Sequence, residues 1–299
     1  MLLITFFWVI SWLVLLRALS VNLGLRKTFL YYLAGDFIDR VVPSPGVAGE
    51  VIRAFFVQKE TRSTYGAVAA AGITNRILAY GVVIAGLSVG TVFMLLTGTI
   101  PAFASGLLLA VWLGALGLFI LLSFVSLEEK AAKKLVSGLI RLLRALGLRR
   151  NVEELSNRAF KFLSLFHEGF KFFSANPRLL IAPIIFNVIS FILNFAVYVL
   201  IFYSLGLTNL PIDFFIIIYF LAGAIQDGLA AFSVGGLEII LTNIFILYGI
   251  PPATSGVAAV LVRSLTFYFP LILGYACIQV IGAKNLLNHI TAGKIESEK

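Results

Sequence analysis

The chain carries the same set of charged residues twice, each time within apolar sequence. Each copy has a Leu-Ala-Gly triplet, an aspartate, a glutamate eleven residues after the aspartate, and then an arginine. The two copies are Asp39, Glu50 and Arg76, and Asp227, Glu238 and Arg263, offset by 188 residues at the acids and by 187 at the arginine. Because a charge in hydrocarbon is costly, such residues indicate a functional site. Two matching sets predict a duplicated protein with its site where the repeats meet.

The composition indicates what surrounds these charges. Of the 299 residues, 60% are hydrophobic and only 12% are charged, and the mean hydropathy is +1.02. Apolar stretches of about 20 residues, long enough to cross a bilayer, recur along the chain. This balance excludes a soluble domain and predicts an all-α polytopic membrane protein. The single cysteine, Cys277, excludes an internal disulfide.

The apolar segments fall into long spans and shorter broken pairs. The expected spans are residues 2–24, 64–97, 102–125, 179–205 and 255–282. Segments 28–58 and 214–250 each consist of two halves too short to cross the bilayer, which predicts two re-entrant helical hairpins. The residues expected to break the hairpins are Pro45, Gly46 and Gly49 in the first and Gly235 and Gly236 in the second.

The distribution of positive charge predicts the orientation in the membrane. Residues 126–178 hold eleven Lys or Arg, whereas segments 98–101, 206–213 and 248–254 hold none. The positive-inside rule then places residues 126–178 and the C-terminus in the cytoplasm and the N-terminus outside. Three spans separate the hairpins, and this odd number predicts inverted repeats. We therefore expect a multi-pass plasma-membrane protein with a first repeat at 1–125, a linker at 126–178 and a second repeat at 179–299.

The linker is basic and amphipathic. In 158–173, a stripe of phenylalanines alternates with basic residues; the stripe is Phe162, Phe166, Phe170 and Phe173, and the basic residues are Arg158, Lys161 and Lys171. This pattern suits a helix at the headgroup boundary of anionic lipid, or alternatively a cytosolic helical hairpin that covers the transmembrane core. Basic charge beside a membrane indicates contact with lipids, and no nucleic-acid partner is expected.

The residue types of the two sets suit an anionic ligand. The half-helices that begin after each break present free N–H groups and a positive dipole end. The guanidinium groups of Arg76 and Arg263 match a phosphate bidentately, and Arg53 shares a helix face with Glu50. The acids could accept an amine or a proton. In the alternative interpretation, each glutamate pairs with an arginine of its own copy and only pins the hairpin.

The sequence gives no sign of catalysis. No nucleophile motif or nucleotide-binding loop stands in a suitable setting. His167 and His289 have no second ligand at metal spacing, so neither a metal nor a cofactor is expected.

The segment 45–53, Pro-Gly-Val-Ala-Gly-Glu-Val-Ile-Arg, followed by Asn75-Arg76, resembles the first signature of the lysylphosphatidylglycerol synthase transmembrane region. Segment 233–238, Ser-Val-Gly-Gly-Leu-Glu, followed by Val262-Arg263, is similar to its second signature, although the proline that often precedes the glycines is absent. The resemblance extends over essentially the whole chain. The residues that it carries over are Glu50, Arg53, Arg76, Glu238 and Arg263.

This resemblance implies a lipid flippase. In larger bacterial members of the family this region moves aminoacylated phosphatidylglycerol between leaflets, and a separate domain makes the lipid. The present sequence includes no such aminoacyl-transferase domain, so lipid synthesis is not expected of it. Other members stand alone or accompany glycosyltransferases.

Three hypotheses follow. The first is a lipid flippase or translocase for an anionic, aminoacylated or lipid-linked headgroup, with a midplane cavity between the repeats. The second is an intramembrane enzyme that acts on phospholipid or polyprenyl-phosphate headgroups. The third is a non-transporting membrane partner of a glycosyltransferase or lipid-modifying enzyme.

Overall fold

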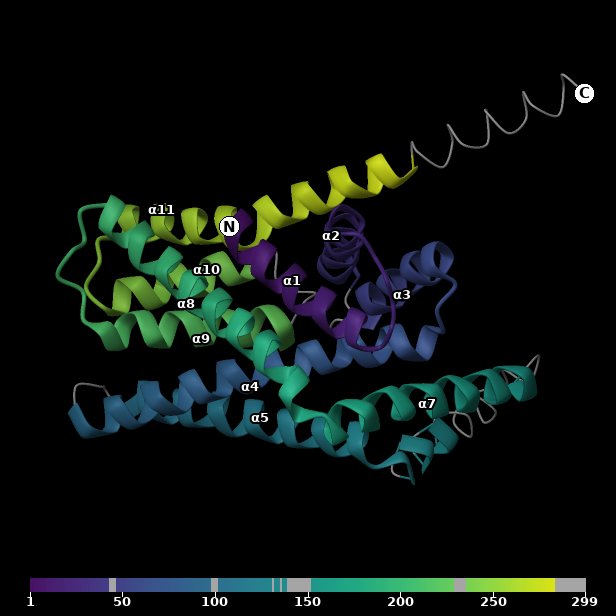
Figure 1. Ribbon diagram of the computed structural model, residues 1–299. Helices are drawn as coiled ribbons and strands as arrows, with labels where there is room; N and C mark the ends of the chain where they lie inside the picture. The colour runs from purple at the N-terminus through teal and green to yellow at the C-terminus, as the bar shows by residue number, and fades with distance from the viewer. Residues whose placement is uncertain are drawn as a thin grey trace, which may run out of the picture.

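The computed structural model describes residues 1–42, 47–97, 102–130, 132–134, 136–138, 152–228 and 235–282, and within these ranges the chain is helical with no strand (Figure 1). The first five helices are α1 (Leu2–Ala18), α2 (Leu25–Val41), α3 (Val47–Thr61), α4 (Tyr65–Thr97) and α5 (Ala102–Leu127). The later elements are α7 (Val152–Ala175), a 3₁₀ turn (Pro177–Leu180), α8 (Ile181–Ser204), α9 (Ile212–Gly228), α10 (Gly236–Leu247), α11 (Pro252–Arg263) and a π-helical turn, η3 (Ser264–Tyr268), after which the helix continues to residue 282.

Among the described residues, three helical segments are long and apolar enough to cross a membrane. They are Tyr65–Val92, Pro177–Ser204 and Pro252–Gly282. The fold therefore confirms the prediction of an all-α membrane protein. The span expected at 102–125 corresponds to α5, whose side chains are only partly described.

The first span is shorter than the sequence predicts. One helix is expected over residues 2–24, but α1 ends at Ala18. Ser20 adopts a positive φ of 60°, and the N–H of Val21 donates to the carbonyl of Leu16. This six-to-one hydrogen bond is typical of a Schellman-type helix end. The expectation of one helix over 2–24 was wrong because this local turn ends the helix.

The two expected hairpins correspond to the helix pairs α2–α3 and α9–α10. At 1.5 Å per residue, the 17 residues of α2 reach only about 26 Å, less than the hydrocarbon thickness of about 30 Å. Pro45 and Gly46 lie outside the described residues, so the first break is not described. At the second break, Gly235 has φ +80°, a conformation that suits glycine, and α10 begins at Gly236.

The order of the elements recurs along the chain. The starts of α2 and α9 are 187 residues apart, those of α3 and α10 are 189 apart, and those of α4 and α11 are 187 apart. These offsets match the spacing of the two charged sets. The recurrence thus extends from single residues to the starts of helices, and a duplication inverted in the membrane stays a prediction.

A buried polar cluster of Ser11, Asn75 and Asn187 joins the two halves of the chain where α1 packs along α8. Within it, the side-chain amide of Asn187 on α8 donates to Ser11 Oγ at 2.9 Å and to Asn75 Oδ1 at 3.2 Å. Ser11 lies on α1 and Asn75 on α4, so three helices meet at one point. Such hydrogen bonds hold helices together where apolar side chains give no preference over lipid.

The described part of the linker packs on the transmembrane core. On α7, Leu163 and Phe166 lie in one buried cluster with Ala69 and Ala70 of α4. His167 is buried there, and its Nδ1 lies 2.9 Å from the carbonyl oxygen of Leu163. These contacts support the alternative in which the linker covers the core.

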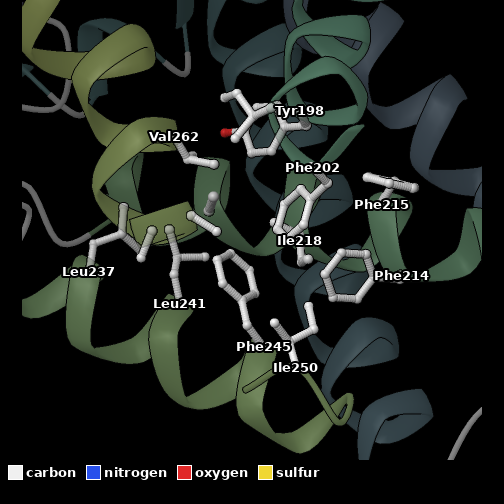
Figure 2. Close-up of a cluster of buried hydrophobic side chains, with 14 residues drawn as sticks. Tyr198, Phe202, Phe214, Phe215, Ile218, Leu237, Leu241, Phe245, Ile250 and Val262 are labelled. Carbon is white, nitrogen blue, oxygen red and sulfur yellow. The ribbon is translucent and has the colours of Figure 1, made fainter. Parts of the chain in front are cut away.

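An aromatic core fixes α10 in the second half (Figure 2). Leu237, Leu241 and Phe245 form a buried stripe along one face of α10. The ring of Phe202 on α8 meets those of Phe245 and Phe214 edge-to-face, with 5.0 Å between centroids in each pair. This packing orients α10, and with it Glu238, which directly follows Leu237.

Candidate functional site

Small residues let α2 and α3 touch at the first charged set. Gly35 on α2 and Gly49 on α3 face each other, and a Cβ on Gly35 would lie 2.8 Å from the carbonyl oxygen of Gly49. A Cβ on Gly49 would collide with the carboxylate of Asp39. On α4, a Cβ on Gly72 would collide in the same way with the carboxylate of Glu50. Glycine at these positions therefore makes room for the two acids.

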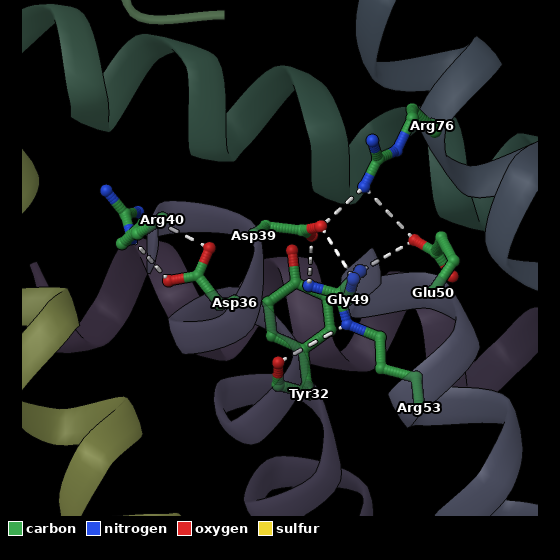
Figure 3. Close-up of polar contacts among 8 residues, drawn as sticks. All are labelled: Tyr32, Asp36, Asp39, Arg40, Gly49, Glu50, Arg53 and Arg76. Atoms are coloured by element: carbon green, nitrogen blue, oxygen red, sulfur yellow. Dashed lines mark hydrogen bonds and ion pairs between the residues drawn. The ribbon is translucent and has the colours of Figure 1, made fainter. Parts of the chain in front are cut away.

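Four charged side chains alternate in sign in this space (Figure 3). Arg53 Nη1 donates to Glu50 Oε1 at 2.6 Å, and Arg53 Nη2 lies 3.5 Å from Asp39 Oδ2. Arg76 Nη2 lies 3.2 Å from Glu50 Oε1 and 3.4 Å from Asp39 Oδ2. The backbone N–H of Gly49 donates to Asp39 Oδ1 at 2.8 Å. The structure thus brings together all four residues predicted for the first site, and their formal charges cancel.

The four side chains differ in exposure. Arg53 is 5% exposed, Asp39 14%, Glu50 17% and Arg76 26%. Arg53 also donates to the carbonyl oxygen of Tyr32 at 3.3 Å, and its guanidinium lies 4.6 Å from the centroid of the Tyr32 ring. Arg53 is therefore the most buried member of the cluster. Arg76 has the most exposed side chain and is the member most accessible to a ligand.

A second ion pair on α2 leads toward the other half of the chain. Arg40 Nε donates to Asp36 Oδ2 at 2.9 Å, and Arg40 Nη1 donates to the carbonyl oxygen of Thr266 at 3.2 Å. Thr266 lies in η3, the π-helical turn that begins directly after Arg263. A π turn interrupts the regular helix hydrogen bonds, and Arg40 supplies a partner from the first half.

In the second set, one glutamate accepts from two donors. Glu238 Oε1 accepts from Arg263 Nε at 3.3 Å and from the Tyr268 hydroxyl at 3.1 Å. Arg263 is fully buried, and its guanidinium lies 4.2 Å from the centroid of the Phe267 ring. Within the described part of the chain, Glu238 Oε2 is buried without a hydrogen-bond partner. The side chain of Asp227 lies outside the described residues, so its predicted place in this set stays a prediction.

One aromatic ring connects the two halves. The ring of Phe267 has Arg263 at 4.2 Å and Arg40 at 5.5 Å from its centroid. A cation within about 6 Å of a ring centroid is attracted by the face of the ring. The first and second halves therefore share a contact beside both charged sets.

Sequence reasoning missed several contributors to these sets. Asp36 could have been found from its helical spacing of four residues before Arg40. Tyr32 contributes a carbonyl and a ring, and no pattern of charge reveals either role. Tyr268 donates to an acid thirty residues earlier in the chain, a contact that only the fold brings about.

The contacts observed within both sets are ion pairs and charge-assisted hydrogen bonds. Among the described residues, no group of three or more His, Cys, Asp or Glu side chains is placed to hold a metal ion. Guanidinium and carboxylate groups can exchange their present partners for phosphate, amine or hydroxyl groups of a ligand.

The helical fold and the charged residues within it define an integral membrane protein whose short paired helices carry arginine–carboxylate sets. The chain belongs to the lysylphosphatidylglycerol synthase TM region family, whose sequence profile matches residues 1–274.

Two relatives are similar over most of their length. A UPF0104 membrane protein of Methanothermobacter thermautotrophicus is 24% identical over 282 residues, which cover 92% of this chain and 81% of the relative. A UPF0104 membrane protein of Pyrococcus horikoshii is 23% identical over 279 residues, covering 89% and 80%. No solved structure is a significant match.

Proposed function

We propose that this protein translocates a membrane lipid by binding its anionic, aminoacylated or lipid-linked headgroup between the two repeats. The observation that carries the proposal is the position of Arg76, its two carboxylate partners and its exposure. Arg76 lies on a helix long enough to span the membrane, it is shared by two carboxylates, and it is the most exposed member of its cluster. Membership of the family supports a lipid substrate.

The charge balance of the first set favours a headgroup with both signs. Asp39, Glu50, Arg53 and Arg76 sum to zero, so a lone phosphate would add an uncompensated charge. A headgroup that brings a phosphate and an amine could place the phosphate on Arg76 and the amine on a displaced carboxylate. Both interactions are charge-assisted and gain strength where water is scarce.

The proposed movement follows from the duplication. If the repeats are inverted, rocking one against the other would open a midplane site to each leaflet in turn. The lipid tails would stay in the bilayer. In this proposal the linker and the C-terminus are cytoplasmic and the N-terminus is outside. A glycosyltransferase or another lipid-modifying enzyme is a candidate partner that would supply or use the lipid.

The pinning alternative rests on the same contacts and makes a different prediction. If the arginines only neutralise the acids, their replacement would affect folding but not the rate of lipid movement by folded protein. The burial of Arg53 favours this structural role for that residue. The exposure of Arg76 favours the binding role, so Arg76 is the residue to test.

The test is leaflet transfer of fluorescent phospholipids in proteoliposomes, with phosphatidylglycerol, lysyl-phosphatidylglycerol and phosphatidylethanolamine as probes. We expect Arg76→Gln and Glu50→Gln to lower the transfer rate by at least about tenfold, because each removes a charge-assisted contact. The matched control is Glu60→Gln, since Glu60 also lies on α3 and also pairs with a cation of α2, Lys27, but at an exposed position. Wild-type rates in folded Arg76→Gln would refute the proposal.

A further inference from the structure

An apolar groove of about 850 Å³ lies between α4, α5, α8 and α9. All of its lining residues are apolar side chains or glycines, among them Gly81 and Ala85 of α4, Phe119 of α5, Val188 of α8 and Ile216 of α9. Helices α4 and α5 precede the linker, and α8 and α9 follow it. The groove therefore lies where the two halves of the chain meet.

The groove lies at the depth of the hydrocarbon. Its lining residues on α4 run from Ile77 to Gly90, within the span Tyr65–Val92. Those on α8 run from Ile184 to Phe195, in the middle of the span Pro177–Ser204. Water and headgroups are scarce at this depth, so only alkyl chains or another apolar protein segment can cover the groove.

Some lining side chains are left uncovered by the protein itself. Val89 is 73% exposed and Ile192 57% exposed. The side chains of Phe191 and Ile216 fill the space beside Gly86 and Gly90, where an added Cβ would lie 2.5 and 2.7 Å from them. At Gly81 an added Cβ would meet nothing closer than the Phe119 ring at 3.6 Å. Gly81 thus leaves room for a side chain in ordinary contact with the Phe119 ring.

The volume agrees with alkyl chains as the occupant. A methylene group is similar in size to a water molecule, whose share of liquid volume is about 30 Å³, so the groove holds roughly 28 methylene groups, enough for one or two acyl chains. The groove is open along one side, and in a bilayer the chains of the surrounding lipids are the apolar material that meets it. A helix of a second copy is the competing occupant, and the labelling experiment distinguishes the two because a helix would shield the groove from the lipid probe.

We infer that the groove binds the acyl tails of a membrane lipid, wedged between the two halves of the protein. This site is separate from the charged set. Arg76 and Ala85 lie nine residues apart on α4, which is two and a half turns, so they project from opposite faces of the helix. The inference that acyl tails bind in the groove therefore does not depend on whether the charged set binds a transported headgroup.

The direct test uses the wild-type protein in liposomes that contain phosphatidylglycerol with a photoactivatable diazirine on one acyl chain. After irradiation, the labelled peptides are identified by mass spectrometry. We expect adducts to concentrate in residues 77–90 and 184–195. The comparison surface is Val260, Ile272 and Val280, which are between 53% and 67% exposed but lie outside the groove. Labelling that follows exposure alone, equal on both surfaces, would overturn the inference.

A pair of matched variants tests the same site by occlusion. Gly81 lines the groove, so Gly81→Phe would place a ring in it. The control Gly117→Phe adds the same ring on α5, where no heavy atom of the described residues lies within 4 Å of the added Cβ. Gly81→Phe should remove the groove adducts and Gly117→Phe should leave them. Unchanged labelling in folded Gly81→Phe would contradict the inference, and if that variant does not fold, the wild-type labelling pattern decides.

The probe also distinguishes a resident lipid from a transported one. If the groove holds a resident lipid, Arg76→Gln should leave the groove adducts unchanged while it slows leaflet transfer. If the tails belong to the transported lipid, both signals should fall together. Either result supports tail binding in the groove, and the transfer rate alone decides the proposed function.

Discussion

The buried ion pair between Glu238 and Arg263 should couple strongly in a double-mutant cycle. Their closest atoms lie 3.3 Å apart, which gives about 5 kcal/mol of Coulomb attraction at an effective dielectric constant of about 20. Arg263 is 0% exposed and Glu238 is 16% exposed, so screening by solvent is small. Removal of one partner of a buried pair typically costs about 3–5 kcal/mol, because it leaves the other charge uncompensated.

We expect Glu238→Gln alone to lower the free energy of unfolding by about 3–5 kcal/mol. Arg263 would then stay charged in the core, with the faces of Phe267 and Tyr268 as remaining favourable contacts. The double variant Glu238→Gln/Arg263→Met should cost about 3 kcal/mol less than the sum of the two single variants. Unfolding in mixed micelles of a mild detergent and dodecyl sulfate, followed by circular dichroism, measures all four free energies.

The control cycle uses Lys27 and Glu60, whose side chains are 39% and 37% exposed. An exposed pair should couple by no more than about 1 kcal/mol. If the buried cycle were additive within about 0.5 kcal/mol, the pair would carry no net interaction and the reasoning from distance and burial would be refuted.

Three further predictions concern packing, polar contacts and pH. Gly274→Ala should destabilise the protein by about 1–3 kcal/mol, because the added Cβ would lie 2.6 Å from the carbonyl oxygen of Leu33. Gly282→Ala should be close to neutral in the same unfolding assay, because no atom of the described part of the chain lies within 4 Å of its added Cβ. Asn187→Ala should lower the free energy of unfolding by about 1–2 kcal/mol, because it removes the hydrogen bonds of the buried polar cluster. An unchanged free energy of unfolding would show that these hydrogen bonds do not stabilise the protein. The hydrogen bond from Lys133, together with Lys171, lowers the pKa of Glu129 below its usual 4.5. The contribution of Glu129 to stability should therefore be present above pH 4.5 and lost as the pH falls through the lowered pKa. Thermal unfolding of Glu129→Gln should lack this acid-dependent loss.

The sequence predicts the first charged set well, and the reason is physical. Each charge in an apolar segment needs a partner, and Arg53 lies one helical turn from Glu50, so their pairing is local. Asp39 lies on α2, within the same short hairpin, and Arg76 lies on α4, the helix that follows the hairpin. Few alternative partners exist within reach, so spacing and charge suffice.

Contacts that depend on packing between the two halves of the chain cannot be predicted from the sequence. The hydrogen bond from Arg40 to the carbonyl of Thr266 joins residues 226 positions apart, and a backbone acceptor leaves no trace in residue type. The end of α1 was missed for a different reason: no charged residue follows Ala18 before Arg26, and the left-handed turn at Ser20 ends the helix. Hydropathy locates membrane segments but not the turns that limit them.

The π turn also accounts for an irregularity in the predicted duplication. A tyrosine, Tyr80, follows Arg76 by four residues, whereas Tyr268 follows Arg263 by five. Within η3 the N–H of Phe269 donates to the carbonyl five residues earlier, so one additional residue is absorbed without breaking the helix. The turn therefore acts as a one-residue insertion that compensates for the one-residue deletion before Arg263. Beyond it the copies return to the 188-residue register of the acids, and Tyr268 reaches Glu238 from the position that Tyr80 holds in the first copy.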